Sequence, residues 1–277
     1  MNYIKDSVID EWIAEEIGYF DLTTNECAIG KQSASIEIIT RSQCVVCGCE
    51  EAKRIAQKLD LSVENFLASG VAAQEKTTVF KATGNAENIH LIWRVTQNII
   101  SFASTIATRT NRLVLLAKAI NPSASIGCTR KSIPNTKALS LKAVLSGGGS
   151  VHRASLTETF LLFNEHRVFF EDDKALFNKL REIKKRLIEK KITIEAKSVE
   201  EAIRFAPYAD ILQLDKLSPI EVEKIKTLAP NAHIAIAGGI DPDNIEDYVK
   251  AGADSIVSSW MFFCDKPVDF EIKISKV

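Results

Sequence analysis

The second half of the chain alternates short apolar segments with segments of helical pattern, and this alternation constrains the fold most. The apolar segments are ASIGCT, TETFLLF, ITIEA, DILQL, HIAIA and DSIVS. Helical patterns lie between them, near residues 136–145, 173–190, 199–205, 218–228 and 241–251. Repeated strand–helix units pack as a parallel sheet or a β/α barrel. About six such units are too few for a complete eight-stranded barrel, so we expect an incomplete one.

Polar residues and glycines gather where these apolar segments end. They are Thr129, Arg130, Lys131, Asn164, Glu195, Asp215, Gly238, Gly239, Ser258 and Ser259. The C-terminal ends of parallel strands form the rim at which β/α barrels build their sites. A glycine pair between a strand and a helix lets backbone N–H groups approach an anion closely. The pattern therefore predicts a polar site at this rim, with the glycine pair as a candidate phosphate site.

The middle of the chain carries cations without acids. No Asp or Glu occurs from Asn88 to Thr157, a segment we call the acid-free span, although the whole chain has 35 basic and 36 acidic residues. Its cations are Arg94, Arg109, Arg112, Lys118, Arg130, Lys131, Lys137, Lys142 and Arg153. Cations gathered without counter-charges repel one another, so a fold that gathers them is stabilised by an anionic ligand. The alternative is a solvated basic face, but the interruptions at Pro134 and Gly147–Gly149 favour a pocket.

Two carboxylates end their predicted strands, Glu195 in ITIEA and Asp215 in LQLD. Acids that face a basic site are suited to Mg²⁺ or to the hydroxyls of a sugar. The alternative is that they only pair with the arginines. Together with the cations and the glycine pair, they predict a phosphorylated sugar with a pyrophosphate leaving group and an acidic acceptor.

The first hundred residues predict an α+β domain. A helix capped by Asp6 or Ser7 is expected first, because apolar residues recur at helical spacing. Further expected elements are strands at 34–38, 44–46 and 71–83, a helix at 50–59, a long helix at 86–120 broken near 101–107, and a returning strand at 268–274.

Several classes of protein are disfavoured. No apolar run is long enough to span a bilayer, and the N-terminus lacks an apolar signal core, so we expect a cytoplasmic protein without membrane insertion. Cys44, Cys47 and Cys49 form a C-x-x-C-x-C cluster; a metal site is one reading, and we favour small buried thiols. Nucleic-acid binding is not expected, because few aromatic residues are interspersed among the cations.

The motifs TRKSIP, GGGSVHR, LQLD and AGGI together resemble the quinolinate phosphoribosyltransferase family. The resemblance runs from EEIGYFDLTT to AGADSIVSSW. It implies the type II phosphoribosyltransferase fold: an N-terminal α/β sandwich domain at 1–110, joined by a C-terminal strand at 268–277, and an incomplete β/α barrel at 111–267 that holds the active site. It also implies a homodimer, and transfer of phosphoribose from phosphoribosyl pyrophosphate (PRPP) to a pyridine dicarboxylate with Mg²⁺.

The resemblance also implies roles for individual residues. Arg94 would reach into the neighbouring subunit's site. The acceptor carboxylates and PRPP would be bound by Arg130, Lys131, His152 and Arg153, with His152 a ligand donor and not a base. Glu195 and Asp215 would hold the ribose hydroxyls and the metal, and with Lys131 they are the predicted catalytic residues. The 5′-phosphate would lie on Gly238, Gly239 and Ser259.

Two departures from the family pattern concern the substrate site. Where the family has HRxGLxDxxLIKDNH, this chain has HRASLTETFLLFNEHR, so Glu158 replaces an aspartate and Phe163 replaces a lysine. A phenyl ring cannot replace an ammonium group, and the lost charge-assisted contact is worth about 1.5–3 kcal/mol. These features resemble the ModD branch, pyrophosphorylases associated with molybdenum transport, whose acceptor the sequence does not identify.

The sequence thus predicts a ModD-like phosphoribosyltransferase with a small acidic acceptor. One alternative is a genuine quinolinate phosphoribosyltransferase of NAD synthesis, with Phe163 stacked on the pyridine. Another is a non-catalytic phosphosugar- or oxyanion-binding protein linked to molybdate uptake. The acids Glu195 and Asp215 argue against the latter, because an anion receptor gains nothing from carboxylates at its rim.

Overall fold

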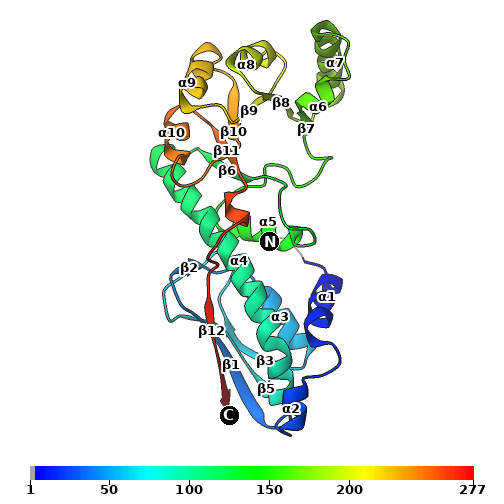
Figure 1. Cartoon of the computed structure of the whole chain (residues 1–277), viewed down its shortest axis with the longest axis vertical. Helices are drawn as coiled ribbons and strands as arrows, with labels where there is room; N and C mark the ends of the chain where they lie inside the picture. The colour runs from blue at the N-terminus through cyan, green and yellow to red at the C-terminus, as the bar shows by residue number, and fades with distance from the viewer. Residues whose placement is uncertain (1–3) are drawn as a thin grey trace. The chain divides into compact units, whose positions relative to one another are not determined.

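The computed structural model describes residues 4–277, and the chain divides into two compact units (Figure 1). Unit 1 contains the residues up to Asn111, together with Ser132–Gly148 and Met261–Val277. Unit 2 contains Arg112–Lys131 and Gly149–Trp260. The segment 132–148, which the predicted boundaries place with the barrel, groups with unit 1.

Unit 1 is built on a four-stranded antiparallel sheet with the order β12-β1-β5-β3. The strands are β1 (Ser33–Thr40), β3 (Ser62–Phe66), β5 (Thr78–Asn85) and β12 (Phe270–Lys276). Alternate residues of β1 are buried, as expected for a sheet with one face on a core. The predicted returning strand is confirmed, because β12 pairs with β1 in a register that sets Ile274 beside Ile36. Strand β3 was not predicted.

The helices of this unit differ from the prediction in three places, one of which is α2, which was not predicted. They are α1 (Asp6–Ile17), α2 (Leu22–Glu26), α3 (Cys49–Lys58), α5 (Lys137–Ser146) and α4 (Ala86–Ile120), whose last residues belong to unit 2. The prediction of a side-chain cap for α1 was wrong: Lys5 precedes the helix without a capping bond, and Asp6 pairs instead with Arg54 of α3.

The predicted break in the long helix was also wrong, because α4 is continuous over 35 residues. Its hydroxyl groups bond in ways that preserve the helix. The hydroxyls of Thr96 and Thr105 donate to carbonyls four residues earlier, at 2.8 and 2.7 Å. The hydroxyls of Ser104 and Thr108 accept from backbone N–H groups of the segment around β2 (Cys44–Val45).

The three clustered cysteines are buried thiols in this segment. Strand β2 pairs with β4 (Ala72–Ala73), and Cys44, Cys47 and Cys49 all lie in the core. Burial raises the pKa of the Cys44 thiol to about 11. Within residues 4–277, no three His, Cys, Asp or Glu side chains are grouped so that they could hold a metal ion.

We expect native alkylation to separate the cysteines into two groups. Cys27 is exposed, whereas Cys44, Cys47 and Cys49 are buried and their raised pKa keeps them protonated near pH 8. Brief iodoacetamide treatment at pH 8, followed by peptide mass spectrometry, should label Cys27 and leave those three unmodified until the chain is unfolded. Equal labelling of Cys27 and Cys44 in the native protein would contradict the structure.

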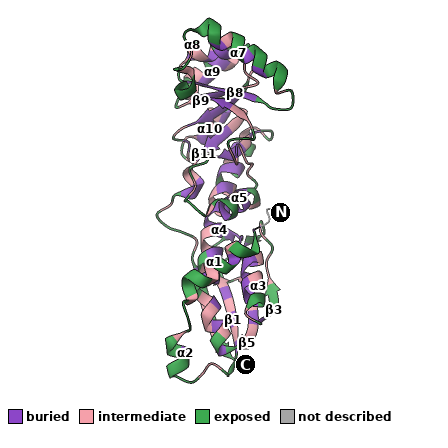
Figure 2. Ribbon diagram, turned by 90° about the vertical axis from the view of Figure 1, so that its right-hand side faces the viewer, coloured by how far each residue is buried: buried purple, intermediate pink, exposed green. Residues whose placement is uncertain are grey.

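Unit 2 is a six-stranded parallel sheet with the order β6-β11-β10-β9-β8-β7. The strands are β6 (Ser125–Cys128), β7 (Phe160–Leu162), β8 (Ile192–Ala196), β9 (Ile211–Asp215), β10 (His233–Ala237) and β11 (Ser255–Ser258). The helices between them are α6 (Asn164–Arg167), α7 (Asp173–Arg186), α8 (Val199–Phe205), α9 (Pro219–Leu228) and α10 (Ile245–Lys250), and a 3₁₀ turn (Trp260–Phe262) follows β11. This confirms the predicted strand–helix repetition. Figure 2 shows β8 and β9 as buried, with exposed residues on the outer surfaces of α7 and α8.

The register gives the sheet two different faces. Glu195 pairs with Gln213, and Asp215 pairs with Ala237, so the acids of β8 and β9 lie on one face. The neighbouring positions of β10 and β11 on this face carry the short side chains Ala235, Ala237 and Val257, which pack together. The opposite face is aliphatic, with Ile194, Leu212, Leu214, Ile236 and Ile256 fully buried.

The sheet curls toward the polar face. A parallel bridge between Gly127 and Ser150 extends it beyond β6, and the His152 side chain lies against Gly127. Yet Nε2 of His152 is 3.2 Å from Oε1 of Gln213 on β9, three strands away from β6. Three strand spacings on a flat sheet would span about 14 Å. The polar face is therefore concave, as in a partial barrel. No helix within residues 4–277 is both long and apolar enough to cross a bilayer.

Candidate active site on the concave face of unit 2

His152 is held on the concave face by a glycine below it and an amide across from it. A Cβ atom on Gly127 would lie 2.9 Å from the His152 Cβ atom, so any larger residue at 127 would displace His152. The bond to Gln213 fixes the ring orientation. Burial lowers the pKa of His152, and the nearby Arg153 lowers it further, against the opposing effect of the Gln213 bond. The imidazole is thus neutral at pH 7, which suits the predicted role of a ligand donor.

Glu195 and Asp215 form an acidic pair on adjacent strands. Glu195 is 7 % exposed, and its pKa is raised, first by burial and then by the negative charge of Asp215. The Lys197 ammonium, 4.0 Å from the Glu195 carboxylate, opposes this shift. A carboxylate whose pKa is raised by a neighbouring carboxylate favours a cation or hydroxyl donors between the two groups.

Arg153 is only 8 % exposed and is oriented by its own loop. Its Nε and Nη2 atoms donate to the carbonyls of Ser155 and Leu156, at 3.1 and 3.2 Å. Burial and the charge of Arg130 lower the Arg153 pKa, while Glu158 opposes them. Glu158 also accepts from the N–H of Ala154 at 2.5 Å, so it closes the loop. The structure therefore brings Arg130 and Arg153 near each other, as predicted, and gives Glu158 a structural contact.

Arg130 and Lys131 follow β6 with exposed side chains. Neither side chain makes an ion pair with any residue in the range 4–277, and the backbone N–H of Lys131 donates to Thr129. Unpaired cations at the end of a parallel strand are free to bind an anion.

The glycine turn after β10 has the conformation that glycine permits. Gly238 and Gly239 have φ angles of 94° and 74°. A Cβ on Gly238 would meet Asp215 Oδ1 at 3.1 Å, so the turn lies directly beside the acidic pair. Asn244 fixes the turn by donating to the Gly239 carbonyl at 2.8 Å. Ser259, half-buried, follows the neighbouring strand β11.

Phe163 follows β7 and is the N-cap residue of α6. Its N–H donates to Nδ1 of His166 at 3.1 Å, and the two rings stack with centroids 5.8 Å apart. The half-buried phenyl ring therefore supplies an apolar surface at the rim where the family pattern has a cation.

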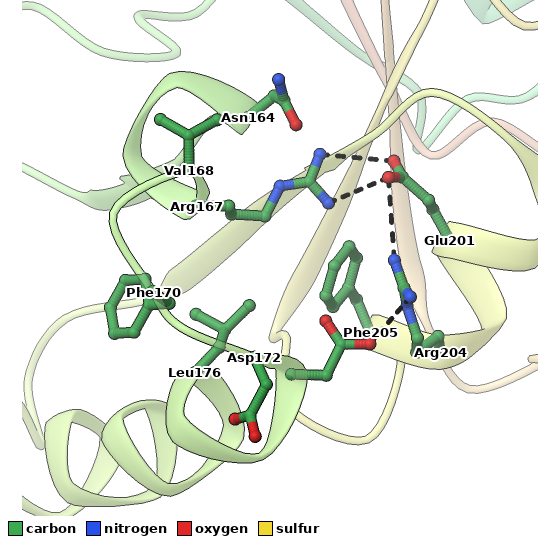
Figure 3. Close-up of a pocket in the computed structure, with 10 residues that line it drawn as sticks. Asn164, Arg167, Val168, Phe170, Asp172, Leu176, Glu201, Arg204 and Phe205 are labelled. Carbon is green, nitrogen blue, oxygen red and sulfur yellow. Dashed lines mark hydrogen bonds and ion pairs between the residues drawn. The ribbon is translucent and has the colours of Figure 1, made fainter.

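A pocket of about 230 Å³ lies between α6, α7 and α8, on the helical side of the sheet (Figure 3). Figure 3 shows Arg167 of α6 directed at Glu201 of α8, and the two make a bidentate pair at 3.2 and 3.3 Å. Glu201 also accepts from the N–H of Lys197, and Arg204 pairs with Asp173. The charged groups of this pocket are thus paired among themselves, apart from Asp172, which caps α7 by accepting from the N–H of Ala175. We interpret the Arg167–Glu201 pair as a brace that holds α6 to the loop carrying Lys197.

The remaining cations of the acid-free span do not all serve an anion site. Lys142 is 4 % exposed and its ammonium lies 2.5 Å from Glu51 and 2.9 Å from Glu50, so it is neutralised within unit 1. The inference that these cations lack counter-charges was wrong for Lys142, because its partner acids lie outside the span. Arg94, also in unit 1, is exposed; it donates to Gln97 and lies over the Trp93 ring.

Sequence reasoning missed four polar residues near the site: Lys197, Gln213, Lys216 and the brace residue Arg167. A signal existed for Gln213, which is a polar residue within a buried apolar strand. For Lys197 and Lys216 the signal was their place one or two residues after a strand-end acid.

The curled parallel sheet, with paired acids, a buried arginine and a glycine turn at one edge, places the chain in the type II phosphoribosyltransferase fold class. The C-terminal domain model of quinolinate phosphoribosyl transferase matches residues 106–273, and the N-terminal domain model matches residues 21–104. The chain belongs to this family.

Individual relatives agree with this assignment. The protein named "Putative pyrophosphorylase ModD" of Pasteurella multocida is 33 % identical over 100 % of this chain and 99 % of its own length. The "Probable nicotinate-nucleotide pyrophosphorylase [carboxylating]" of Methanothermobacter thermautotrophicus is 28 % identical over 96 % and 98 %. The structure of the nicotinate-nucleotide pyrophosphorylase from Francisella tularensis superposes with a TM-score of 0.90, at 24 % identity over 99 % and 98 % of the two chains. The last of these comparisons confirms the predicted fold.

Proposed function

We propose that this protein transfers phosphoribose from PRPP to a small acidic acceptor and releases pyrophosphate. One observation carries the proposal: the Glu195–Asp215 pair lies beside the Gly238–Gly239 turn on the same concave face as His152. A sugar phosphate needs both an anion site and acceptors for its hydroxyls, and this edge of the sheet offers both.

Each group has a role in the proposed transfer. The acceptor nitrogen attacks C1 of PRPP as the bond to pyrophosphate breaks, through an oxocarbenium-like state comparable to that of glycoside cleavage. Glu195 and Asp215 orient the ribose hydroxyls and stabilise the positive charge that develops on the sugar. Arg130, Lys131 and Arg153 bind the anionic groups of the acceptor and of PRPP. Gly238, Gly239 and Ser259 bind the 5′-phosphate.

Mg²⁺ forms part of the proposal. Protein sites for this ion commonly supply one or two carboxylates, and substrate phosphates and water complete the shell. The Glu195–Asp215 pair fits that requirement. When bound there, the ion neutralises the charge on pyrophosphate, so the leaving group requires no proton from a side chain.

The acceptor distinguishes this proposal from the quinolinate reaction. Phe163 offers a ring where the family pattern has an ammonium, so we propose a ModD-like acceptor and not a dicarboxylate bound through that lysine. The alternative of a genuine quinolinate phosphoribosyltransferase is supported by the similarity to the archaeal relative named as carboxylating. We also propose a homodimer in which Arg94 serves the neighbouring subunit's site.

An acceptor screen tests the function. The purified protein, PRPP and Mg²⁺ would be mixed with single pyridine, pyrimidine and purine acids, quinolinate among them, and pyrophosphate release followed. We expect release with an acceptor other than quinolinate, and none from Arg130→Ala. Rapid turnover of quinolinate would favour the alternative, and binding of PRPP without any product would support the receptor hypothesis.

Phe163→Lys should improve the handling of a dicarboxylate. The new ammonium restores a charge-assisted contact at the rim, worth about 1.5–3 kcal/mol or roughly ten- to a hundred-fold in binding. Quinolinate affinity, measured by calorimetry in the wild type and the variant, should rise by that factor. Phe163→Met is the matched control, because it changes the ring without adding charge. An unchanged quinolinate affinity in Phe163→Lys would show that this position does not set the acceptor.

A further inference from the structure

Lys216 has a backbone conformation that is unusual for a lysine. It directly follows Asp215 at the end of β9 and has a φ angle of 60°, in the left-handed region. Its N–H donates to the Ala237 carbonyl at 2.9 Å, which continues the pairing with β10 by one residue. Non-glycine residues in this region are uncommon and concentrate at ligand-binding sites. The conformation fixes the direction in which the side chain leaves the strand.

The Lys216 side chain lies against the first glycine of the turn. A Cβ on Gly238 would lie 2.6 Å from Lys216 Cγ and 3.1 Å from Asp215 Oδ1. The stem of the lysine and the carboxylate of the aspartate therefore occupy the space beside Gly238. Gly239 has no such neighbours, because a Cβ atom there would meet nothing within 4 Å. Side-chain atoms therefore fill the space beside Gly238, whereas the space beside Gly239 is empty.

The Lys216 ammonium has no charged partner among residues 4–277. Lys216 is exposed, and its ammonium makes no ion pair or hydrogen bond with any residue from 4 to 277. By contrast, Lys197, the cation at the end of β8, lies 4.0 Å from Glu195. An unpaired ammonium on a flexible stem that starts beside a glycine turn suits a phosphate group.

We propose that Lys216 is a substrate-binding residue that closes over the Gly238–Gly239 turn and pairs with the terminal phosphate of the phosphoribosyl group. The proposal rests on the proposed function and deepens it, because it assigns a cation to the sugar-phosphate end of PRPP. The acids on this face hold the ribose, and the lysine supplies the positive charge that the glycine turn lacks. Lys216 thereby favours phosphorylated over unphosphorylated sugars.

Direct binding of ribose 5-phosphate tests the proposal without turnover. Calorimetry would compare the wild type with Lys216→Met, which keeps a stem of similar length, and with Lys216→Arg, which keeps the charge. We expect Lys216→Met to bind ribose 5-phosphate about ten- to a hundred-fold more weakly, while Lys216→Arg stays within a few-fold of the wild type. Pyrophosphate, which occupies the other end of the substrate, should bind all three proteins equally.

The control is Lys224→Met on α9, an exposed lysine away from the strand ends, which should bind ribose 5-phosphate like the wild type. Unchanged binding in Lys216→Met, equal weakening of pyrophosphate, or no binding to the wild type would each overturn the inference. Failure of the proposed function looks different: ribose 5-phosphate would still bind in a Lys216-dependent way, yet the acceptor screen would yield no product.

Discussion

Asp215→Asn is expected to lower kcat/KM for PRPP-dependent transfer by about a hundred- to a thousand-fold. The loss follows because a fixed negative charge beside the developing oxocarbenium is replaced by a neutral amide of nearly the same shape. Pyrophosphate release with saturating acceptor, measured across PRPP concentrations, separates kcat from KM. The amide still accepts hydrogen bonds from the ribose, so most of the loss should appear in kcat.

The pH dependence provides a second readout of the same variant. Burial and the charge of Asp215 both raise the pKa of Glu195. If ionised Glu195 is required, activity falls as the pH drops through this raised pKa. Removing the Asp215 charge lowers the Glu195 pKa, so the acidic limb of the residual activity should move to lower pH. An acidic limb that stays in place, or a loss of less than about three-fold, would contradict the role assigned to the pair.

The second large effect concerns stability. Lys142→Ala should destabilise the fold by about 3–5 kcal/mol, because it leaves Glu50 and Glu51 without their buried counter-charge. Ion pairing here outweighs burial: burial lowers the Lys142 pKa, but the two glutamates raise it overall. Urea unfolding, followed by circular dichroism at neutral pH, measures the change in free energy.

Two comparisons make the stability result specific. Lys179→Ala removes an exposed partner of Glu182 on α7 and should change stability by less than about 1 kcal/mol. Lys142→Met combined with Glu51→Leu replaces buried charge by apolar groups, and should recover much of the loss. If Lys142→Ala unfolds at the wild-type urea concentration, the ion pairs of Lys142 with Glu50 and Glu51 do not stabilise unit 1.

The fold was largely predictable because its signals are local. Apolar segments of four or five residues between helical patterns identify parallel strands, and Glu195, Asp215 and the Gly238 turn lie at the strand ends where the sequence put them. The continuity of α4 was not predictable from composition. Its serines and threonines resemble a break in sequence, and only the contacts to Cys47 and Val45 show how the hydroxyls are satisfied.

The positions of the candidate site residues were more predictable than their contacts. Burial of Lys142 depends on acids 91 and 92 residues earlier in the chain, a separation that no periodicity reveals. The Gln213–His152 contact depends on the curl of the sheet, and the brace between Arg167 and Glu201 depends on the packing of two helices. Such pairings are set by tertiary structure, which single-sequence patterns do not encode.

The short side chains of the concave face have a consequence for how substrates diverge in this architecture. Ala235, Ala237 and Val257 are short, so little side-chain volume projects from the β10–β11 half of the face. The long polar side chains project from β8 and β9. Under the proposed function, a different acceptor is accommodated by exchanging a few residues around the mouth, such as Phe163, while the strands keep their spacing. On that proposal, we expect proteins of this type to keep the residues assigned to the sugar on β8 and β9 and to vary in those that contact the acceptor.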